Sequence, residues 1–218
     1  GGDAIHVYNL ANGLSELGHS VEIIHCIDSY IFKYKNKQKK YGYSNHPNVK
    51  VYSLKNTFGA LSPIMSYLTG YPVFKKRLKT LLENNKYDLI HYHEISFFGA
   101  KIFQYGKAPK IHTAHTHFSI CPQTTMLRYG KVVCNKKGFD TNCHFCLLTT
   151  GKPPQIWRHT NLIENSLKHL KTIITPSEYL KNKLIDGGIR ANIIVLPHFV
   201  PDPLPVKNKE TESYFLFV

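Results

Sequence analysis

Apolar residues recur along this chain with two different periods, and segments with one period follow segments with the other. The first segment has an apolar residue at about every 3.6 positions, which predicts an amphipathic helix. These residues are Ala4, Val7, Ala11, Leu14 and Leu17. Gly18 follows at the position where many helices end with a residue of positive φ.

Short apolar runs rich in β-branched residues return through the rest of the chain and predict strands. They cover residues 21–26, 49–54, 89–93, 110–114, 172–175 and 192–196. Helical patterns lie on both sides of residues 70–72 and over residues 97–103, 153–170 and 179–186. This alternation predicts an α/β fold, with a parallel sheet covered by helices on both faces. In such a sheet, ligands bind at the carboxyl ends of the strands.

Several polar side chains are predicted to lie at those strand ends. His93 and Glu94 end one strand, His115 follows the next, and His6 lies one turn into the first helix. Because parallel strands end at a common edge, we expect His93, Glu94 and His115 to converge on the same edge as Gly1 and Gly2. An imidazole there could act as a general base or hydrogen-bond to a sugar hydroxyl. Each histidine taken alone also fits a purely structural role.

The chain opens with a glycine pair, Gly1 and Gly2, directly before the first helix. Glycines let backbone N–H groups approach a ligand closely, and the helix N-terminus adds partial positive charge. A phosphate or a carboxylate is the expected ligand. The same pair also fits a simple turn before a surface helix.

Four of the five cysteines gather in one long segment that is predicted to be irregular. They are Cys121, Cys134, Cys143 and Cys146. The last two have the CxxC spacing that lets two thiolates share one tetrahedral zinc ion. A structural zinc ion would hold such a long loop in place, and four thiolates would leave no open position for catalysis. The alternatives are four reduced thiols without metal, or a disulfide.

The net charge is +14, from 28 basic and 14 acidic residues, and the basic residues are clustered. The segment 32–43 interleaves lysines with aromatic residues, as in proteins that bind single-stranded nucleic acid. A second cluster, residues 75–79, lies on a predicted helix that could rest on anionic lipid or simply face solvent. A zinc-stabilised nucleic-acid-binding module is therefore an alternative interpretation of the chain.

Three further expectations concern location and domain organisation. No apolar run is long enough to span a membrane, and the clustered cysteines favour a reducing cytoplasm. Residues 1–200 are predicted to form one domain that lacks its first strand. Residues 201–213 resemble a linker, and residues 214–218 the first strand of a further domain.

A family resemblance is carried by segments that span nearly the whole chain in order. After the glycine pair come HVYNLANGLSELGHSVEII, YDLIHYHE, IHTAHTHFSICP, LRYGKVVC, IITPSEYLKNKL and IIVLPHFVPD. The chain resembles the N-terminal half of family 4 glycosyltransferases, which are GT-B enzymes with two Rossmann-like domains. The resemblance implies retaining transfer of a sugar from a nucleotide-sugar donor to an acceptor, without a catalytic metal.

The resemblance also implies roles for particular residues. Gly1 and Gly2 match the glycine loop that contacts the donor phosphates, and His115 matches the histidine that contacts the transferred sugar. The residues that we assign to the acceptor side are His6, His93, Glu94 and Ser177. The acceptor is expected to be a polysaccharide or a lipid-linked sugar at an anionic membrane surface, and nucleic acid is not an expected partner.

The chain departs from the family at three points. Thr116 stands where the family often has Asp or Asn, and His198-Phe199 replaces a common Asn-Gly. The donor-binding domain, with its paired glutamates, is not part of this sequence. We therefore expect no turnover from this polypeptide alone, because the leaving diphosphate needs positive charge from that domain.

Overall fold

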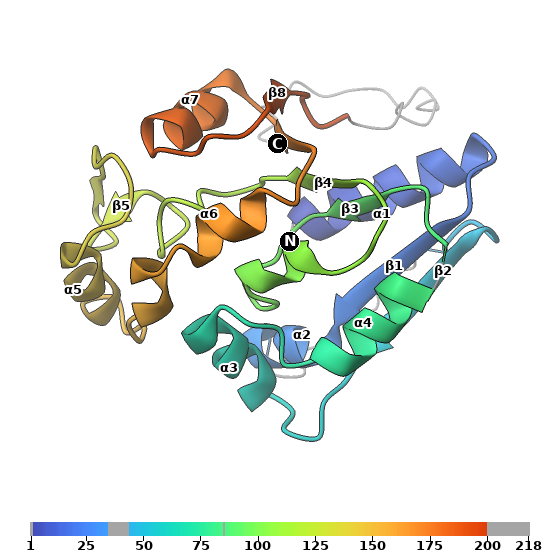
Figure 1. Cartoon of the computed structure of the whole chain (residues 1–218), viewed down its shortest axis with the longest axis horizontal. Coiled ribbons are helices and arrows are strands. Elements are labelled where there is room, and N and C mark those ends of the chain that lie inside the picture. The colour runs from blue at the N-terminus through green and yellow to red at the C-terminus, as the bar shows by residue number, and fades with distance from the viewer. Residues whose placement is uncertain (1, 35–43, 85, 200–218) are drawn as a thin grey trace, which may run out of the picture.

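The computed structural model describes residues 2–34, 44–84 and 86–199 (Figure 1). Six parallel strands form two sheets within this part of the chain. The first sheet pairs β1 (Val21–Cys26) with β2 (Val49–Leu54). The second has the order β3-β4-β7-β8, from β3 (Ile90–Tyr92), β4 (Lys110–Thr113), β7 (Thr172–Thr175) and β8 (Ile193–Val195). The predicted α/β fold with parallel strands is confirmed, although the strands form two sheets.

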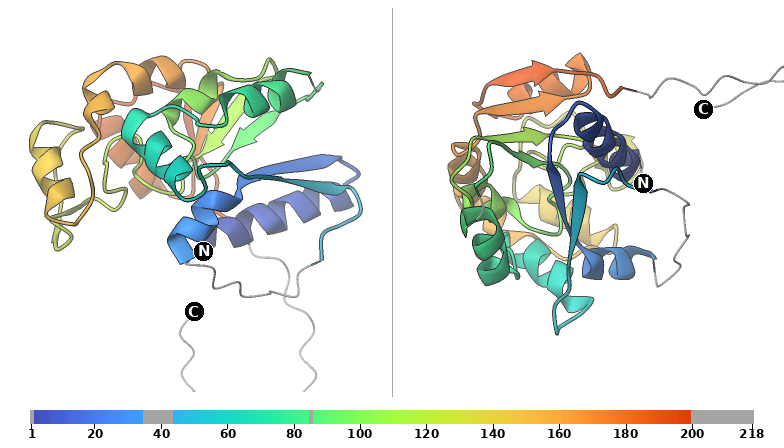
Figure 2. Two further views of the ribbon diagram at one scale, coloured as in Figure 1. Left: turned by 90° about the horizontal axis from the view of Figure 1, so that it is seen from below. Right: turned by 90° about the vertical axis from the view of Figure 1, so that its right-hand side faces the viewer.

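Helices flank both sheets. Helix α1 (Gly2–Glu16) packs against β1 and β2 and runs alongside them in Figure 2. Helices α2 (Ile27–Tyr34) and α3 (Leu61–Thr69) pack together, and α7 (Glu178–Asp186) covers β7 and β8. At the end of α1, Gly18 has the expected positive φ of 92°.

Two predicted helices differ from the sequence expectation. The segment 97–103 is a 3-10 helix, η1 (Ala100–Gln104). The segment 153–170 is divided into η2 (Ile156–His159) and α6 (Leu162–Leu167). The division follows from a long-range contact, because the Trp157 indole N–H donates to the carbonyl of Tyr67 at 2.9 Å and holds η2 against α3.

One continuous core joins the two sheets. Its most deeply buried apolar side chains are Leu54, Leu78, Phe103, Ile173 and Leu184. Helix α4 (Lys75–Asn84) contributes Leu78 and Leu82 to this core, so its basic residues face solvent. None of the helices in the described residues is both long and apolar enough to cross a membrane.

The cysteine-rich segment contains more regular structure than the sequence predicts. A hairpin pairs β5 (Leu127–Arg128) with β6 (Val132–Val133), and α5 (Asn142–Leu148) follows. Residues 129–131 connect the two strands, and Tyr129 and Gly130 have positive φ of 55° and 73° in the turn that the Lys131 N–H closes on the Arg128 carbonyl at 3.1 Å. Figure 1 shows β5 and α5 at one end of the molecule, away from β1 and β2.

Candidate functional site

Four histidines meet where the strands of the larger sheet end. His93 follows β3, His115 follows β4, His198 follows β8, and His6 lies in the second turn of α1. The ring centroid of His6 lies 5.7 Å from that of His93, 5.4 Å from His115 and 3.9 Å from His198. The predicted convergence of His93 and His115 is therefore observed, and His6 and His198 join them.

Three of these rings form a chain of hydrogen bonds. The Nδ1 atom of His93 lies 3.1 Å from Nε2 of His115, and Nδ1 of His115 lies 3.1 Å from Nε2 of His198. A neutral imidazole has one N–H donor and one acceptor nitrogen. The N–H donors of successive rings must therefore point in the same direction along these two hydrogen bonds. The tautomer of one ring then determines the tautomers of the other two.

Two further histidines support this cluster from inside the sheet. His112 is buried, and its Nδ1 lies 3.1 Å from the carbonyl oxygen of Tyr92. His91 contacts the Thr113 hydroxyl through Nε2 at 2.7 Å, and its ring centroid lies 4.1 Å from that of His93. Both rings hold β3 against β4, which is the structural role that a histidine in a sheet often has.

Burial favours the neutral form of His93 and His115. It lowers the pKa of His93 to about 2, with a further contribution from neighbouring imidazoles. The pKa of His115 is lowered to about 4, mainly by burial and then by His198 and His6, while Asp3 opposes the shift. A neutral imidazole can accept a hydrogen bond or a proton from a hydroxyl group.

The remaining predicted site residues are placed differently. Glu94 is exposed, and its carboxylate accepts hydrogen bonds from the backbone N–H and the hydroxyl of Ser96. Ser177 caps α7, where its hydroxyl accepts a hydrogen bond from the N–H of Leu180 at 3.3 Å. Both residues follow parallel strands. Glu94 lines the same small cavity as His93 and His115, but among the described residues neither Glu94 nor Ser177 forms a hydrogen bond or ion pair with the four histidines.

The glycine pair is only partly described. Gly1 lies outside the described residues, and Gly2 is the first residue of α1. The ring centroid of His6, in the second turn, lies 5.4 Å from that of His115, which places this helix end beside the histidines. A Cβ atom at Gly2 would meet nothing within 4 Å, so contacts within the described protein do not require glycine there.

The cavity at the strand ends is small. Its volume is about 10 Å³, and His93, Glu94, His115 and Thr116 are among its lining residues. That space holds at most one water molecule. A ligand larger than water could therefore not enter this cavity.

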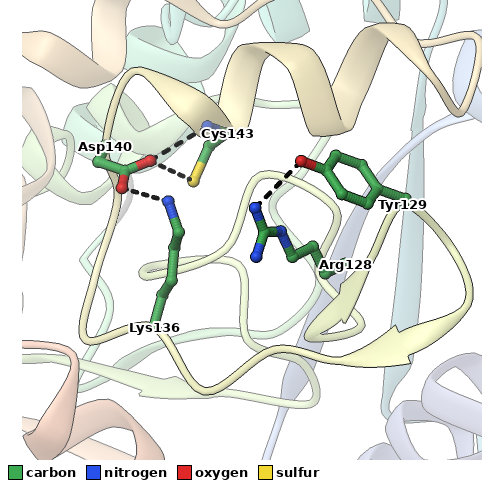
Figure 3. Close-up of polar contacts among 5 residues, drawn as sticks. All are labelled: Arg128, Tyr129, Lys136, Asp140 and Cys143. Atoms are coloured by element: carbon green, nitrogen blue, oxygen red, sulfur yellow. Dashed lines mark hydrogen bonds and ion pairs between the residues drawn. The ribbon is translucent and has the colours of Figure 1, made fainter.

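The four predicted cysteine ligands line a second cavity, of about 30 Å³, at the β5–α5 end of the molecule. All of them are free thiols. Within the described residues, no three His, Cys, Asp or Glu side chains are already arranged to hold a metal ion. Figure 3 shows Lys136 and the Cys143 thiol directed at the Asp140 carboxylate, while Arg128 faces the Tyr129 hydroxyl.

Sequence reasoning missed His198 as a site residue. It lies three residues after the last strand, so the rule that selected His93 and His115 also applies to it. Only the packing of β8 beside β7 shows that its ring reaches His115.

Parallel strands with polar side chains at their carboxyl ends define an α/β protein whose ligands bind at that sheet edge. The family model Glycosyltransferase Family 4 matches residues 1–202, so the chain belongs to this family. It is a glycosyltransferase domain, and the family in general uses a nucleotide-sugar donor and a sugar acceptor. Comparison with curated proteins and with solved structures gave no match.

Proposed function

We propose that this chain is the acceptor-side domain of a GT-B glycosyltransferase that transfers a hexosyl group with retention of configuration. The donor is a nucleotide sugar, and the acceptor is a polysaccharide or a lipid-linked sugar. The observation that carries the proposal is the four-histidine cluster at the carboxyl edge of the sheet in a chain of this family.

His115 is the residue that we assign to the transferred sugar. Both of its ring nitrogens are held by imidazoles, His93 on one side and His198 on the other. Because it is neutral at pH 7, it can exchange hydrogen bonds with sugar hydroxyls without paying for a buried charge. His6, His93 and the exposed Glu94 form the acceptor side of the same surface, and Ser177 lies at the next strand end.

The donor diphosphate is assigned to the N-terminus of α1. This helix has 15 residues, and its free backbone N–H groups favour an anion. Gly1 and Gly2 would let the diphosphate approach those groups closely. Asp3 lies in the first turn, so further positive charge must come from a donor-binding domain, and the described domain alone is not expected to turn over.

The basic residues of α4 and the proposed acceptor support a location for the protein in the cell. We place the protein in the cytoplasm, held peripherally on an anionic inner membrane face by the basic residues of α4. Those residues are exposed, whereas the apolar face of α4 is buried in the core, so the attraction is electrostatic.

The nucleic-acid interpretation has less support. Most of the lysine-aromatic segment, residues 35–43, lies outside the described residues. The family match favours a glycosyltransferase. Measurable affinity for a single-stranded oligonucleotide, falling steeply as salt rises, would revive this alternative.

The proposal is tested by replacing His115 with alanine in the full-length enzyme. We expect turnover of donor and acceptor to fall by about 100-fold or more, because a positioned proton-transfer group contributes at least that much. The circular dichroism spectrum should not change. The matched control is His169→Ala, because His169 is exposed and is not one of the four histidines that contact one another. Unchanged turnover in His115→Ala would refute the assignment.

A further inference from the structure

Four cysteines from three separate elements surround one small cavity. Cys121 lies in the turn region after β4, Cys134 directly follows β6, and Cys143 and Cys146 are one turn apart on α5. The cavity of about 30 Å³ is large enough for a single ion or water molecule and too small for a ligand such as a sugar. Residues three apart on a helix share a face, so the two α5 thiols can reach the same point.

The surroundings of the cavity are positively charged. Arg128 and Lys136 line it together with the cysteines. Lys136 pairs with Asp140, but none of the ion pairs between described residues involves Arg128. The site therefore has more positive than negative charge while the thiols are protonated.

Arg158 adds a buried charge beside this site. Its guanidinium donates to the side-chain oxygen of Gln155 and to the carbonyl of Phe118, and it lies 4.9 Å from the ring centroids of Phe118 and Trp157. Its Nη1 atom has no hydrogen-bond partner, and no described carboxylate forms an ion pair with it. The Phe118 carbonyl that it contacts lies three residues before Cys121. A buried cation of this kind requires a nearby negative charge.

We propose that Cys121, Cys134, Cys143 and Cys146 bind one Zn²⁺ ion as four thiolates, and that Arg158 and Arg128 balance the charge of that centre. Each thiol releases one proton to solvent, so one zinc ion and four thiolates form a centre with two negative charges. Nothing is oxidised or reduced. The donor set fits zinc, which prefers four sulfur ligands at about 2.3 Å in structural sites.

One hydrogen bond to a proposed ligand sulfur is already formed. The backbone N–H of Tyr129 donates to Sγ of Cys146 at 3.1 Å, as outer groups often do to a metal ligand. Cys143 instead contacts Asp140 at 3.5 Å. For zinc to bind, the Cys143 thiol must turn away from Asp140 toward the cavity that it lines, by rotation about the Cα–Cβ bond.

The zinc centre would hold the backbone that leads from the sheet edge to α5. Three residues that are not glycine have positive φ there: Thr124, Met126 and Tyr129. Such conformations persist only where surrounding contacts fix them. His117 lies two residues after His115, and its carbonyl accepts the N–H of Cys121 at 2.8 Å. The metal has a structural role here, since four thiolates leave no position for water.

The test is elemental analysis of the purified chain, which does not depend on transferase activity. We expect about one zinc ion per chain after expression with added zinc. Cys143→Ser and Cys121→Ser should each lower that content, whereas Cys26→Ser should keep it. Cys26 is the matched control because it is buried at the end of β1 and does not line the cavity.

A spectroscopic measurement keeps the proposal testable if the cysteine variants fail to fold. The wild-type chain loaded with Co²⁺ should show the strong visible absorption of a tetrahedral thiolate site and thiolate charge-transfer bands. Three results would overturn the proposal: a metal-free chain with all five thiols titratable, a disulfide among the four cavity cysteines, or an iron–sulfur absorption spectrum.

Discussion

Among single side chains, burial lowers the pKa of the histidines within β3 and β4. It lowers the pKa of the buried His112 to about 3, although the hydrogen bond to Tyr92 opposes the shift. The pKa of His91 is lowered to about 4 by burial and by His6 and His115. Each of these rings therefore binds a proton more readily in the unfolded chain than in the folded protein.

This difference predicts that acid destabilises the fold. The contribution of these histidines is present above the unfolded pKa of about 6.5 and is lost as pH falls below it. From pH 7 to pH 5, we expect His112 alone to lower the free energy of unfolding by about 2 kcal/mol. The measurement is denaturant unfolding at both pH values.

The matched variants separate this effect from general acid sensitivity. His112→Asn keeps a donor for the Tyr92 carbonyl and removes the titrating group, so its stability should depend less on pH. His169→Asn should behave like the wild type, because His169 is exposed. A stability that stays constant between pH 7 and pH 5 would contradict the prediction.

Among the elements, the contact between α3 and η2 decides how the segment 153–170 folds. Helix α3 ends at Gly70, which has a φ of 73°. A Cβ atom there would lie 2.6 Å from Cδ2 of Leu162 and 2.8 Å from the Trp157 ring. The absence of a side chain at Gly70 therefore lets η2 and α6 pack against the end of α3.

Gly70→Ala should accordingly destabilise the protein by about 3 kcal/mol, from backbone strain and from overpacking together. Gly188→Ala is the matched control: its φ is 88°, but a Cβ there would meet nothing within 4 Å. It should cost only the strain, about 1 kcal/mol. Thermal unfolding of both variants measures the difference, and equal losses would show that the packing argument is wrong.

For the whole molecule, the positive charge predicts binding to anionic surfaces. The chain carries a net charge of +14, and α4 presents Lys75, Lys76 and Arg77 to solvent. Each basic residue near an anionic membrane contributes about 1 kcal/mol. Because the apolar face of α4 is buried, we expect this binding to be electrostatic and to weaken as salt increases.

Sedimentation with phosphatidylserine vesicles at two salt concentrations measures this binding. Replacing Lys75, Lys76 and Arg77 with Gln should reduce binding by roughly 100-fold, given about 1 kcal/mol for each residue. Replacing Lys168, Lys171 and Arg190 with Gln removes the same charge from other exposed positions. If the two triple variants bind equally, net charge alone explains the attraction and α4 has no special role.

Much of the fold could be predicted from sequence because its signals are local. Strands β1, β2 and β7 have the predicted bounds, and helix α7 begins one residue before its predicted start. Apolar periodicity and β-branched runs act within a few residues, so they identify elements and their order. The histidines at strand ends could be predicted for the same reason, since parallel strands place their ends at one edge.

The remaining features depend on contacts between residues far apart in the chain. The addition of His198 to the cluster requires β8 to lie beside β7, and the break between η2 and α6 depends on Trp157 reaching Tyr67. Likewise, only packing brings Cys121 to the same cavity as α5. The sequence alone determined the α/β class, the family and the candidate residues, whereas the tertiary structure decided which side chains meet. Local periodicity fixes a residue's element, but side-chain contact depends on how the elements pack.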